Sequence, residues 1–148
     1  MKKPFADNPK KSIFVRLFRV NDMVQNGIKG YQEDFVTEDK LAKNVGSGLV
    51  RVYATPQMIA LIEKTAVLSV EPYLEDGQST VGTLVNVTHC AAPPAGMKVH
   101  AETELVEVDR RKLTFKVSAY DERGLIGEGV HERFIIDIAK FQAKADSK

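Results

Sequence analysis

The second half of the chain alternates apolar and polar residues over four segments, each bounded by turn residues. This alternation is typical of half-buried β-strands, in which neighbouring side chains point to opposite faces of a sheet. The separators "APPAG", "DRR" and "DERG" are short enough for antiparallel hairpins. We therefore expect a mostly antiparallel meander over residues 79–90, 96–108, 112–121 and 124–138.

Three segments lie nearer the N-terminus. "GIKGYQEDFVT" alternates enough to predict one further half-buried strand. "SIFVRLFRV" is apolar with two arginines, and its pattern leaves an edge strand, a short helix or a surface-docking segment open. Residues 1–12 hold four lysines and two prolines without a period, which indicates a mobile, solvated arm.

One segment has the pattern of a long helix, beginning at Thr55 and Pro56 and continuing through "QMIALIEKTAVLSVEPYL". A threonine at the N-cap can accept an unpaired backbone N–H, and a proline that follows it has no N–H to leave unpaired. Pro72 should mark the last turn. We expect this helix to be largely enclosed, because its apolar positions cover more than half of its circumference: Met58, Ile59, Leu61, Ile62, Ala66, Val67 and Val70.

These elements predict an α+β fold in which an antiparallel sheet of about five strands curls around one helix. The chain has 148 residues, enough for a single core, and its 43% hydrophobic and 28% charged residues are typical of a globular protein. A net charge of +1 gives no overall field to attract nucleic acid or an anionic membrane. No apolar run is long enough to span a membrane, and the single cysteine, Cys90, is typical of a reducing cytoplasm.

Glu63 is the first candidate for chemistry, because helical spacing places it among apolar neighbours. A carboxylate in an apolar site has a raised pKa and can act as a base or a nucleophile. The alternative is that Glu63 lies at the boundary of the apolar stripe, solvated near Lys64. The residue pattern leaves both interpretations open.

Thr55 and His89 are further candidates. Thr55 suits an N-cap, and a helix N-terminus can also stabilise a developing oxyanion. His89 ends an apolar strand beside a turn, where functional side chains often lie, although an isolated histidine is more often structural. His100 and His131 have no comparable neighbours, and "VHERF" fits simple alternation with a cross-strand ion pair.

Glycines inside the predicted strands indicate bulges or close backbone approach, most clearly Gly82 and also Gly127 and Gly129. The chain has no glycine-rich phosphate loop and no Gly-x-Ser-x-Gly elbow, which disfavours nucleotide hydrolysis and an α/β-hydrolase triad. The lone cysteine has no partner for a zinc knuckle, and we expect no metal.

Taken together, "YATPQMIALIEKTA", "PYL", "VGTLVNVTHCAAPPAGMKV" and "GVHERFIID" resemble the fluoroacetyl-CoA thioesterase family of hotdog-fold proteins. The resemblance covers residues 24–141, leaving an N-terminal extension at 1–23 and a tail at 142–148. It implies a hotdog fold, with an antiparallel sheet wrapped around a long central helix. It also implies a homodimer or dimer of dimers that binds acyl-CoA at the subunit interface.

Matched residue by residue, the resemblance implies catalytic roles for Thr55, Glu63 and His89. Gly82 matches a glycine near the substrate carbonyl, and Arg133 matches an arginine at the substrate end of the site. Thr55 and Glu63 are eight residues apart, so their backbones should lie about 12 Å apart along the helix and the side chains should not touch. His89, the substrate or a residue of a second chain would have to lie between them.

The chain departs from the fluoroacetyl-specific pattern ahead of the threonine, where that pattern has lid phenylalanines. Gly46 and Leu49 stand near those positions, so selectivity for fluoroacetate is not expected. We expect a cytoplasmic acyl-CoA thioesterase for small or medium acyl groups, with CoA as part of the substrate and no permanent cofactor. A non-catalytic module that binds acyl-CoA or another small ligand is the first alternative. A hotdog hydratase is the second, although no Asp/His pair on the helix or its preceding loop matches that activity.

Overall fold

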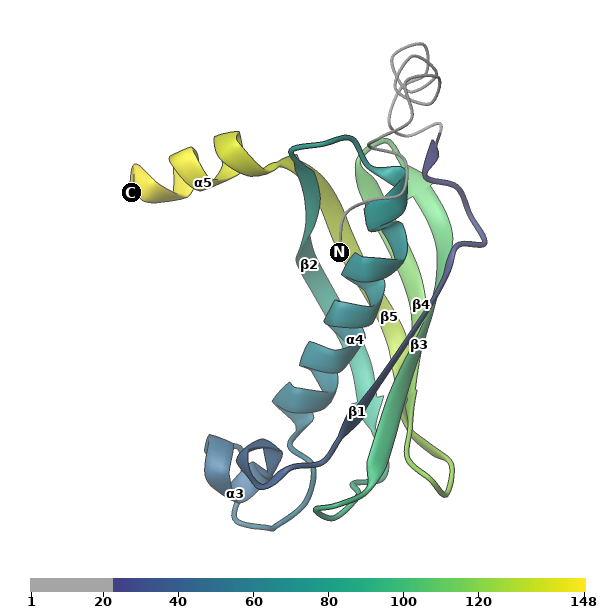
Figure 1. Ribbon diagram of the computed structural model, residues 1–148, viewed down its shortest axis with the longest axis vertical. Coiled ribbons are helices and arrows are strands. Elements are labelled where there is room, and N and C mark those ends of the chain that lie inside the picture. The colour runs from purple at the N-terminus through teal and green to yellow at the C-terminus, as the bar shows by residue number, and fades with distance from the viewer. Residues whose placement is uncertain (1–22) are drawn as a thin grey trace.

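A computed structural model describes residues 23–148. The predictions for residues 1–12 and for "SIFVRLFRV" lie outside the described residues. The described chain forms these elements (Figure 1): β1 Lys29–Phe35, η1 Glu38–Lys40, α3 Ala42–Val45, α4 Thr55–Val70, η2 Glu71–Tyr73, β2 Gln78–His89, β3 Lys98–Asp109, β4 Lys112–Tyr120, β5 Leu125–Asp137 and α5 Ile138–Asp146.

All five strands form one antiparallel sheet in the order β1-β3-β4-β5-β2. The meander from β3 to β5 confirms the prediction, and so does the strand predicted from "GIKGYQEDFVT". The hairpin predicted at "APPAG" is wrong, because β2 pairs with β5 and not with β3. The residues after β2 pair elsewhere, through a bridge between Val52 and Pro94. β2 therefore lies at one edge of the sheet.

The sheet curves around α4, which lies along its concave face (Figure 1). The alternation places apolar side chains of the central strands toward α4, and the helix contributes Met58, Leu61, Ile62, Ala66 and Val70 to the same core. Burial of these side chains supplies the main stabilisation of the fold.

The enclosure of α4 is less complete than its pattern predicts. Ile59 and Val67 are only half-buried, and Leu68 is exposed. The reason is that the sheet covers one side of the helix, and residues 23–148 leave the other side uncovered. The last turn also ends earlier than predicted, because Pro72 lies in the separate 3₁₀ turn η2.

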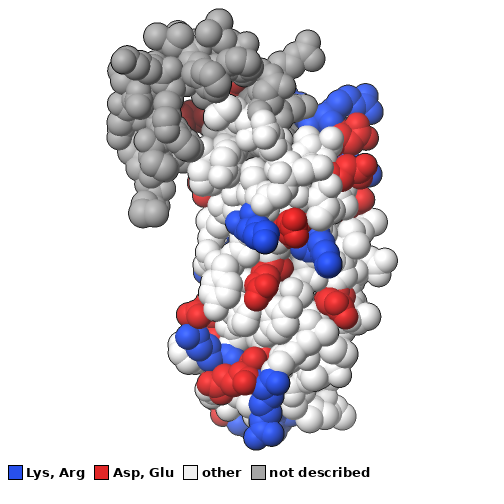
Figure 2. Space-filling view, turned by 90° about the vertical axis from the view of Figure 1, so that its right-hand side faces the viewer, with Lys and Arg blue, Asp and Glu red and all other residues white. Residues whose placement is uncertain are grey.

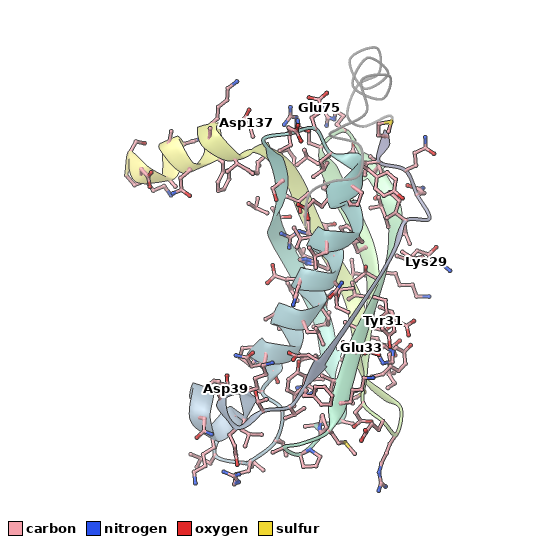
Figure 3. The ribbon with its side chains drawn as sticks, in the orientation of Figure 1. Lys29, Tyr31, Glu33, Asp39, Glu75 and Asp137 are labelled. Atoms are coloured by element: carbon pink, nitrogen blue, oxygen red, sulfur yellow. The ribbon has the colours of Figure 1, made fainter. Side chains whose placement is uncertain are left out.

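The side of the molecule formed by β1 and its neighbours carries both signs of charge, interspersed among uncharged residues (Figure 2). Lys29, Tyr31 and Glu33 lie on the side of β1 away from α4 (Figure 3). The Lys98 ammonium contacts the Glu33 carboxylate at 3.1 Å. Interspersed charges of this kind keep a sheet face solvated without creating a field of one sign.

The helix α5 was not predicted from the sequence. Asp137 caps it by accepting a hydrogen bond from the Lys140 N–H at 3.2 Å. None of its residues is buried, and it extends away from the sheet on the side of β2 (Figure 1). Across residues 23–148, no helix is long and apolar enough to cross a membrane.

Candidate active site

The start of α4 is tied to the segment that follows β2. The Tyr53 N–H donates to the Pro93 carbonyl at 2.8 Å, and the Ala54 N–H donates to the Lys40 carbonyl at 2.9 Å. The first bond fixes the residues immediately before Thr55 beside the residues that follow His89, and the second ties them to η1. Thr55 and His89, which are 34 residues apart in the sequence, are thereby brought together.

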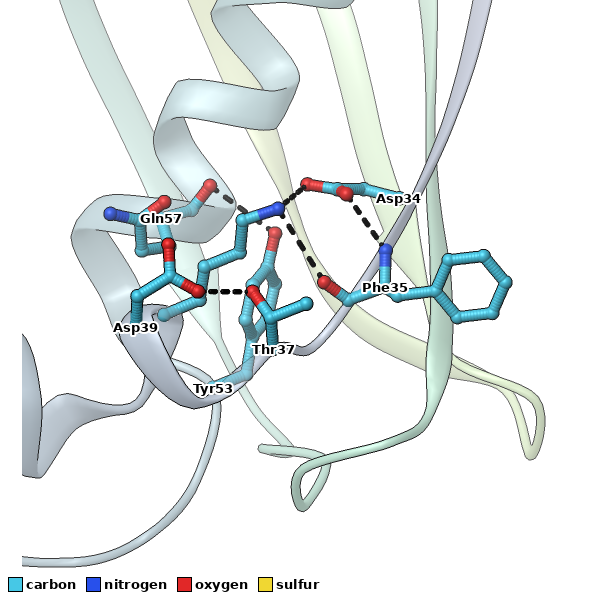
Figure 4. A network of polar contacts seen from close by, with 7 residues as sticks. Asp34, Phe35, Thr37, Asp39, Tyr53 and Gln57 are labelled. Atoms are coloured by element: carbon cyan, nitrogen blue, oxygen red, sulfur yellow. Dashed lines mark hydrogen bonds and ion pairs between the residues drawn. The ribbon is translucent and has the colours of Figure 1, made fainter.

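A polar network supports the same corner from the other side (Figure 4). Lys40 forms an ion pair with Asp34, and its ammonium also approaches the Phe35 carbonyl at 3.5 Å. The Tyr53 hydroxyl donates to the Gln57 carbonyl at 3.2 Å, and burial raises the pKa of Tyr53. A neutral, buried phenol just before the N-cap residue therefore anchors the first turn of α4.

Thr55 and His89 are hydrogen-bonded, with 2.7 Å between Thr55 Oγ1 and His89 Nδ1. The prediction that Thr55 is the N-cap is wrong. Ala54 takes the N-cap position with extended backbone angles and no side-chain cap bond, and Thr55 is the first helical residue. The threonine hydroxyl is thus directed to the imidazole rather than to the helix backbone.

His89 has its second ring nitrogen free for a reaction partner. Nε2 is buried and makes no hydrogen bond within residues 23–148. Burial lowers the pKa of His89, and the backbone of Ala91 acts in the opposite direction. A histidine that is neutral near pH 7 and hydrogen-bonded through one nitrogen can accept or deliver a proton through the other.

Glu63 contacts Arg133, with 3.1 Å between Oε2 and Nη1. The side chain of Glu63 is 40% exposed and that of Arg133 is 7% exposed. The carboxylate is therefore partly exposed, as the boundary interpretation expects, and its charged partner is Arg133.

Gly82 provides the space that the Glu63 carboxylate occupies. A Cβ at Gly82 would lie 2.5 Å from Glu63 Oε2 and 3.3 Å from Arg133 Nη1. The close approach predicted for this glycine is confirmed. The strand also shifts register between Gly82 and Leu84, where β2 carries a bulge against β5.

Two further residues hold the Arg133 guanidinium in place. Thr80 accepts from Nε at 2.7 Å through its hydroxyl and from Nη2 at 2.9 Å through its carbonyl. His131 lies 3.1 Å from Nη1 through its Nε2 atom. The arginine is therefore fixed from three directions, by β2, β5 and α4.

Sequence reasoning missed His131. The same alternation that places Arg133 toward α4 also places His131 there, two residues earlier, and this shared face was the available signal. The cross-strand ion pair expected in "VHERF" is made by Glu132 on the opposite face, whose carboxylate lies 3.5 Å from the ammonium of Lys112 on β4.

The candidate residues form two groups at the two ends of β2. Thr55 and His89 form one, and Glu63, Gly82 and Arg133 form the other. Gly82 and His89 are separated by about 20 Å of strand. No hydrogen bond within residues 23–148 joins the groups. The described part of one chain therefore forms two separate groups and not one continuous site.

The side chains of the candidate site can act as acids, bases and nucleophiles. Residues 23–148 contain no cluster of three or more histidine, cysteine, aspartate or glutamate side chains that could hold a metal ion. Cys90, next to His89, is a free and exposed thiol. An imidazole–hydroxyl pair and a carboxylate–guanidinium pair are suited to proton transfer and to attack on a carbonyl.

Comparison with known proteins identifies relatives with this arrangement of elements. The model of the fluoroacetyl-CoA-specific thioesterase family matches residues 36–139. The fluoroacetyl-CoA thioesterase of Streptantibioticus cattleyicolor is 44% identical over 97 residues, which cover 66% of this chain and 70% of the relative.

Solved structures agree. A structure of a fluoroacetyl-CoA thioesterase aligns with a TM-score of 0.80 and 35% identity over 84% of this chain and 96% of that one. A threonine-to-serine variant solved with acetyl-CoA aligns with a TM-score of 0.80 and 34% identity, over 83% of this chain and 97% of that one. A hot-dog-like protein of Thermanaerovibrio acidaminovorans, 18% identical, shares the fold with a TM-score of 0.78 over 88% of this chain and 96% of that one. The chain therefore has the hotdog fold and belongs to the fluoroacetyl-CoA-specific thioesterase family.

Proposed function

We propose that this acyl-CoA thioesterase hydrolyses a small or medium acyl-CoA at a site shared between two protomers. The hydrogen bond between Thr55 and His89 carries the proposal, because it directs a hydroxyl to an imidazole whose other nitrogen is buried and unpartnered within residues 23–148. The pair lies at one end of β2, and Glu63 lies at the other end with Arg133.

In the proposed reaction, the thioester carbonyl carbon is attacked by Glu63 or by a water molecule that Glu63 activates. The carbon–sulfur bond then breaks, and the CoA sulfur leaves as a thiolate. In the water route, the proton removed from the attacking water passes through His89 to that sulfur; in the Glu63 route, a proton from solvent does so, and His89 is neutral before and after the step. Backbone N–H groups near Gly82 or at the start of α4 stabilise the oxyanion. If Glu63 attacks first, water hydrolyses the resulting anhydride, so both routes give a carboxylic acid and free CoA. The proposal involves no metal and no permanent cofactor.

The free edge of β2 supports a homodimer. Residues 82–86 of this edge strand are all exposed, including Leu84 at 43% and Val85 at 39%. An unpaired apolar strand edge is a ready template for a second copy. Antiparallel pairing of two β2 strands around a two-fold axis would bring the His89 end of one strand to the Gly82 end of the other. The two separated groups would then meet in each of two identical sites, and dimers could pair further.

Mixed dimers test the shared site. We expect Glu63→Gln and His89→Ala each to lower thioester hydrolysis by about 100-fold or more as pure proteins. When equal amounts are unfolded and refolded together, half of the dimers contain one chain of each kind, and each such dimer has one intact site. The mixture should regain about one quarter of native activity. A mixture as inactive as its components would place the whole site in one chain.

The binding-module alternative predicts a different result from the same proteins. If the native protein is a thioesterase, it should release thiol from a panel of acyl-CoA esters at a rate that depends on the length of the acyl group. Saturable acyl-CoA binding without turnover at any chain length would favour the non-catalytic module. Hydration of an enoyl-CoA without thiol release would favour the hydratase.

We also propose weak discrimination between fluoroacetyl-CoA and acetyl-CoA. Gly46 stands near a lid aromatic of the fluoroacetyl-specific pattern, and its φ of 81° disfavours any larger residue there. Leu49 is 93% exposed. We expect kcat/KM for the two substrates to agree within about tenfold. We expect the protein in the cytoplasm, in keeping with its single free thiol.

A further inference from the structure

His131 is a fully buried histidine whose two ring nitrogens are both hydrogen-bonded. Nδ1 lies 2.8 Å from the Leu84 carbonyl oxygen, and Nε2 lies 3.1 Å from Arg133 Nη1. A carbonyl can only accept, so Nδ1 carries the proton. Arginine can only donate, so Nε2 is the acceptor. These partners assign a neutral imidazole with one defined tautomer.

The Nη1 atom of Arg133 has two N–H groups, and both are used. One donates to Glu63 Oε2 at 3.1 Å and the other to His131 Nε2 at 3.1 Å. Thr80 occupies Nε and Nη2, so the guanidinium cannot rotate without breaking bonds in a buried site. Within residues 23–148, Arg133 is the one hydrogen-bond partner of the Glu63 carboxylate.

From this geometry we infer that His131 is a positioning residue for thioester hydrolysis, acting through Arg133 to fix the orientation of the Glu63 carboxylate. The inference rests on the proposed role of Glu63. Without the Nε2 acceptor, one buried N–H of Arg133 would be left without a partner, which is costly. Glu63 would then be the one remaining acceptor of Nη1, and a small shift of that atom within the bonds to Thr80 would turn the carboxylate.

The arrangement requires a neutral His131. The groups that face the ring are Arg133 on its own strand, Glu63 from α4, the Leu84 carbonyl from β2 and Phe115 from β4. Burial lowers the pKa of His131, the charge of Arg133 lowers it further, and Leu84 and Glu63 oppose the change. A proton on His131 Nε2 would place two donors, the Nε2–H and an N–H of Arg133, face to face. Acidification should therefore shift Arg133 and, through it, the Glu63 carboxylate.

Two amide substitutions separate the two hydrogen bonds of His131. His131→Asn can keep a donor for the Leu84 carbonyl but has no group that reaches Arg133. His131→Gln can place an amide oxygen near the position of Nε2 and so restore an acceptor for Arg133. Both remove the aromatic ring, so loss of ring packing is common to the pair. Leu105→Val, in the core of β3, serves as a control for general destabilisation.

We expect His131→Asn to lower kcat by about 10- to 100-fold with KM changed by less than about threefold, the scale for a displaced catalytic group. We expect His131→Gln to keep kcat within about fivefold of native, and Leu105→Val to keep native kcat at a comparable loss of thermal stability. Equal losses in both histidine variants, or native kcat in His131→Asn, would overturn the inference.

Histidine side-chain nitrogen NMR of the native protein gives a measurement that does not depend on activity. The resonances of His131, identified by their loss in His131→Gln, should show a proton on Nδ1 and none on Nε2 from pH 8 to pH 6. A proton on Nε2 would overturn the inference. Glu63→Gln, assayed in parallel, separates the two proposals: native activity there refutes the proposed role of Glu63, whereas inactivity there with native His131→Asn refutes only the positioning role.

Discussion

Replacement of Gly82 by alanine should separate activity from stability. The added Cβ would lie 2.5 Å from Glu63 Oε2, whereas ordinary van der Waals contact needs roughly 3.5 Å. The carboxylate would have to move by about 1 Å. It is the end of a flexible, 40% exposed side chain that can turn toward solvent, so the cost in folding free energy is limited mainly to a weaker bond with Arg133.

The catalytic cost of the same movement is large. Displacement of a reacting group by about 1 Å lowers rates by about 100-fold, so we expect Gly82→Ala to lose 10- to 100-fold in kcat. Gly82 does not have a positive φ, so alanine causes no backbone strain there. Lower entropy of the unfolded chain offsets part of the clash, and we expect the melting temperature to change by less than about 5 °C.

Thiol release from an acyl-CoA and thermal unfolding by circular dichroism measure the two effects in the same preparation. Gly129→Ala is the contrasting variant, because its Cβ would lie 2.0 Å from the Asn86 backbone oxygen, which cannot move independently of β2. We expect Gly129→Ala to lose stability strongly. Native kcat in Gly82→Ala, or stability losses of equal size in both variants, would refute the reasoning.

Three further predictions concern other parts of the chain. Thr55→Val removes the hydroxyl that contacts His89 and should lower kcat by about 100-fold at unchanged stability, whereas Thr55→Ser should stay within about tenfold; equal rates would contradict this role. Folding lowers the pKa of His131, so below about pH 6.5 the unfolded chain binds a proton that the folded chain does not. The free energy of unfolding should therefore decrease as the pH is lowered, by at most about 1.4 kcal/mol per pH unit. Urea unfolding at pH 7.5, 6 and 5 should show a weaker fall in His131→Gln, and an identical fall would argue against it. Asp137→Ala removes the cap of α5 and should cost about 1 kcal/mol of helix stability, seen as faster amide exchange at 138–146 with native activity; unchanged exchange would contradict the capping role.

Local sequence patterns located the helix and strands but did not show which strands pair with one another. Alternation placed each strand of the meander within two residues of its observed ends, and the Thr-Pro pair located the start of α4 at Thr55. Alternation reports which face a residue occupies and not which strand lies beside it, so the short "APPAG" segment was interpreted as a hairpin. The pairing of β2 with β5 depends on contacts between residues about 50 apart.

The hydrogen bonds among the candidate residues were not predictable from the sequence. Family resemblance identified Thr55, Glu63, His89, Gly82 and Arg133, and the structure groups them in two pairs with Gly82 beside the second. The partner of Glu63 is 70 residues away in the sequence, so no helical spacing could identify it. Thr55 has good capping chemistry, but the adjacent imidazole binds its hydroxyl.

The exposed thiol of Cys90 has practical consequences for experiments on this protein. The chain has one cysteine, which directly follows His89 at the end of β2. A maleimide dye would therefore label each chain once, beside the imidazole, and its fluorescence should respond when an acyl-CoA binds. Thiol-detecting reagents used to follow CoA release would also react with Cys90, giving an initial signal of one equivalent per chain before turnover. A Cys90→Ser protein removes that signal and provides the unlabelled reference.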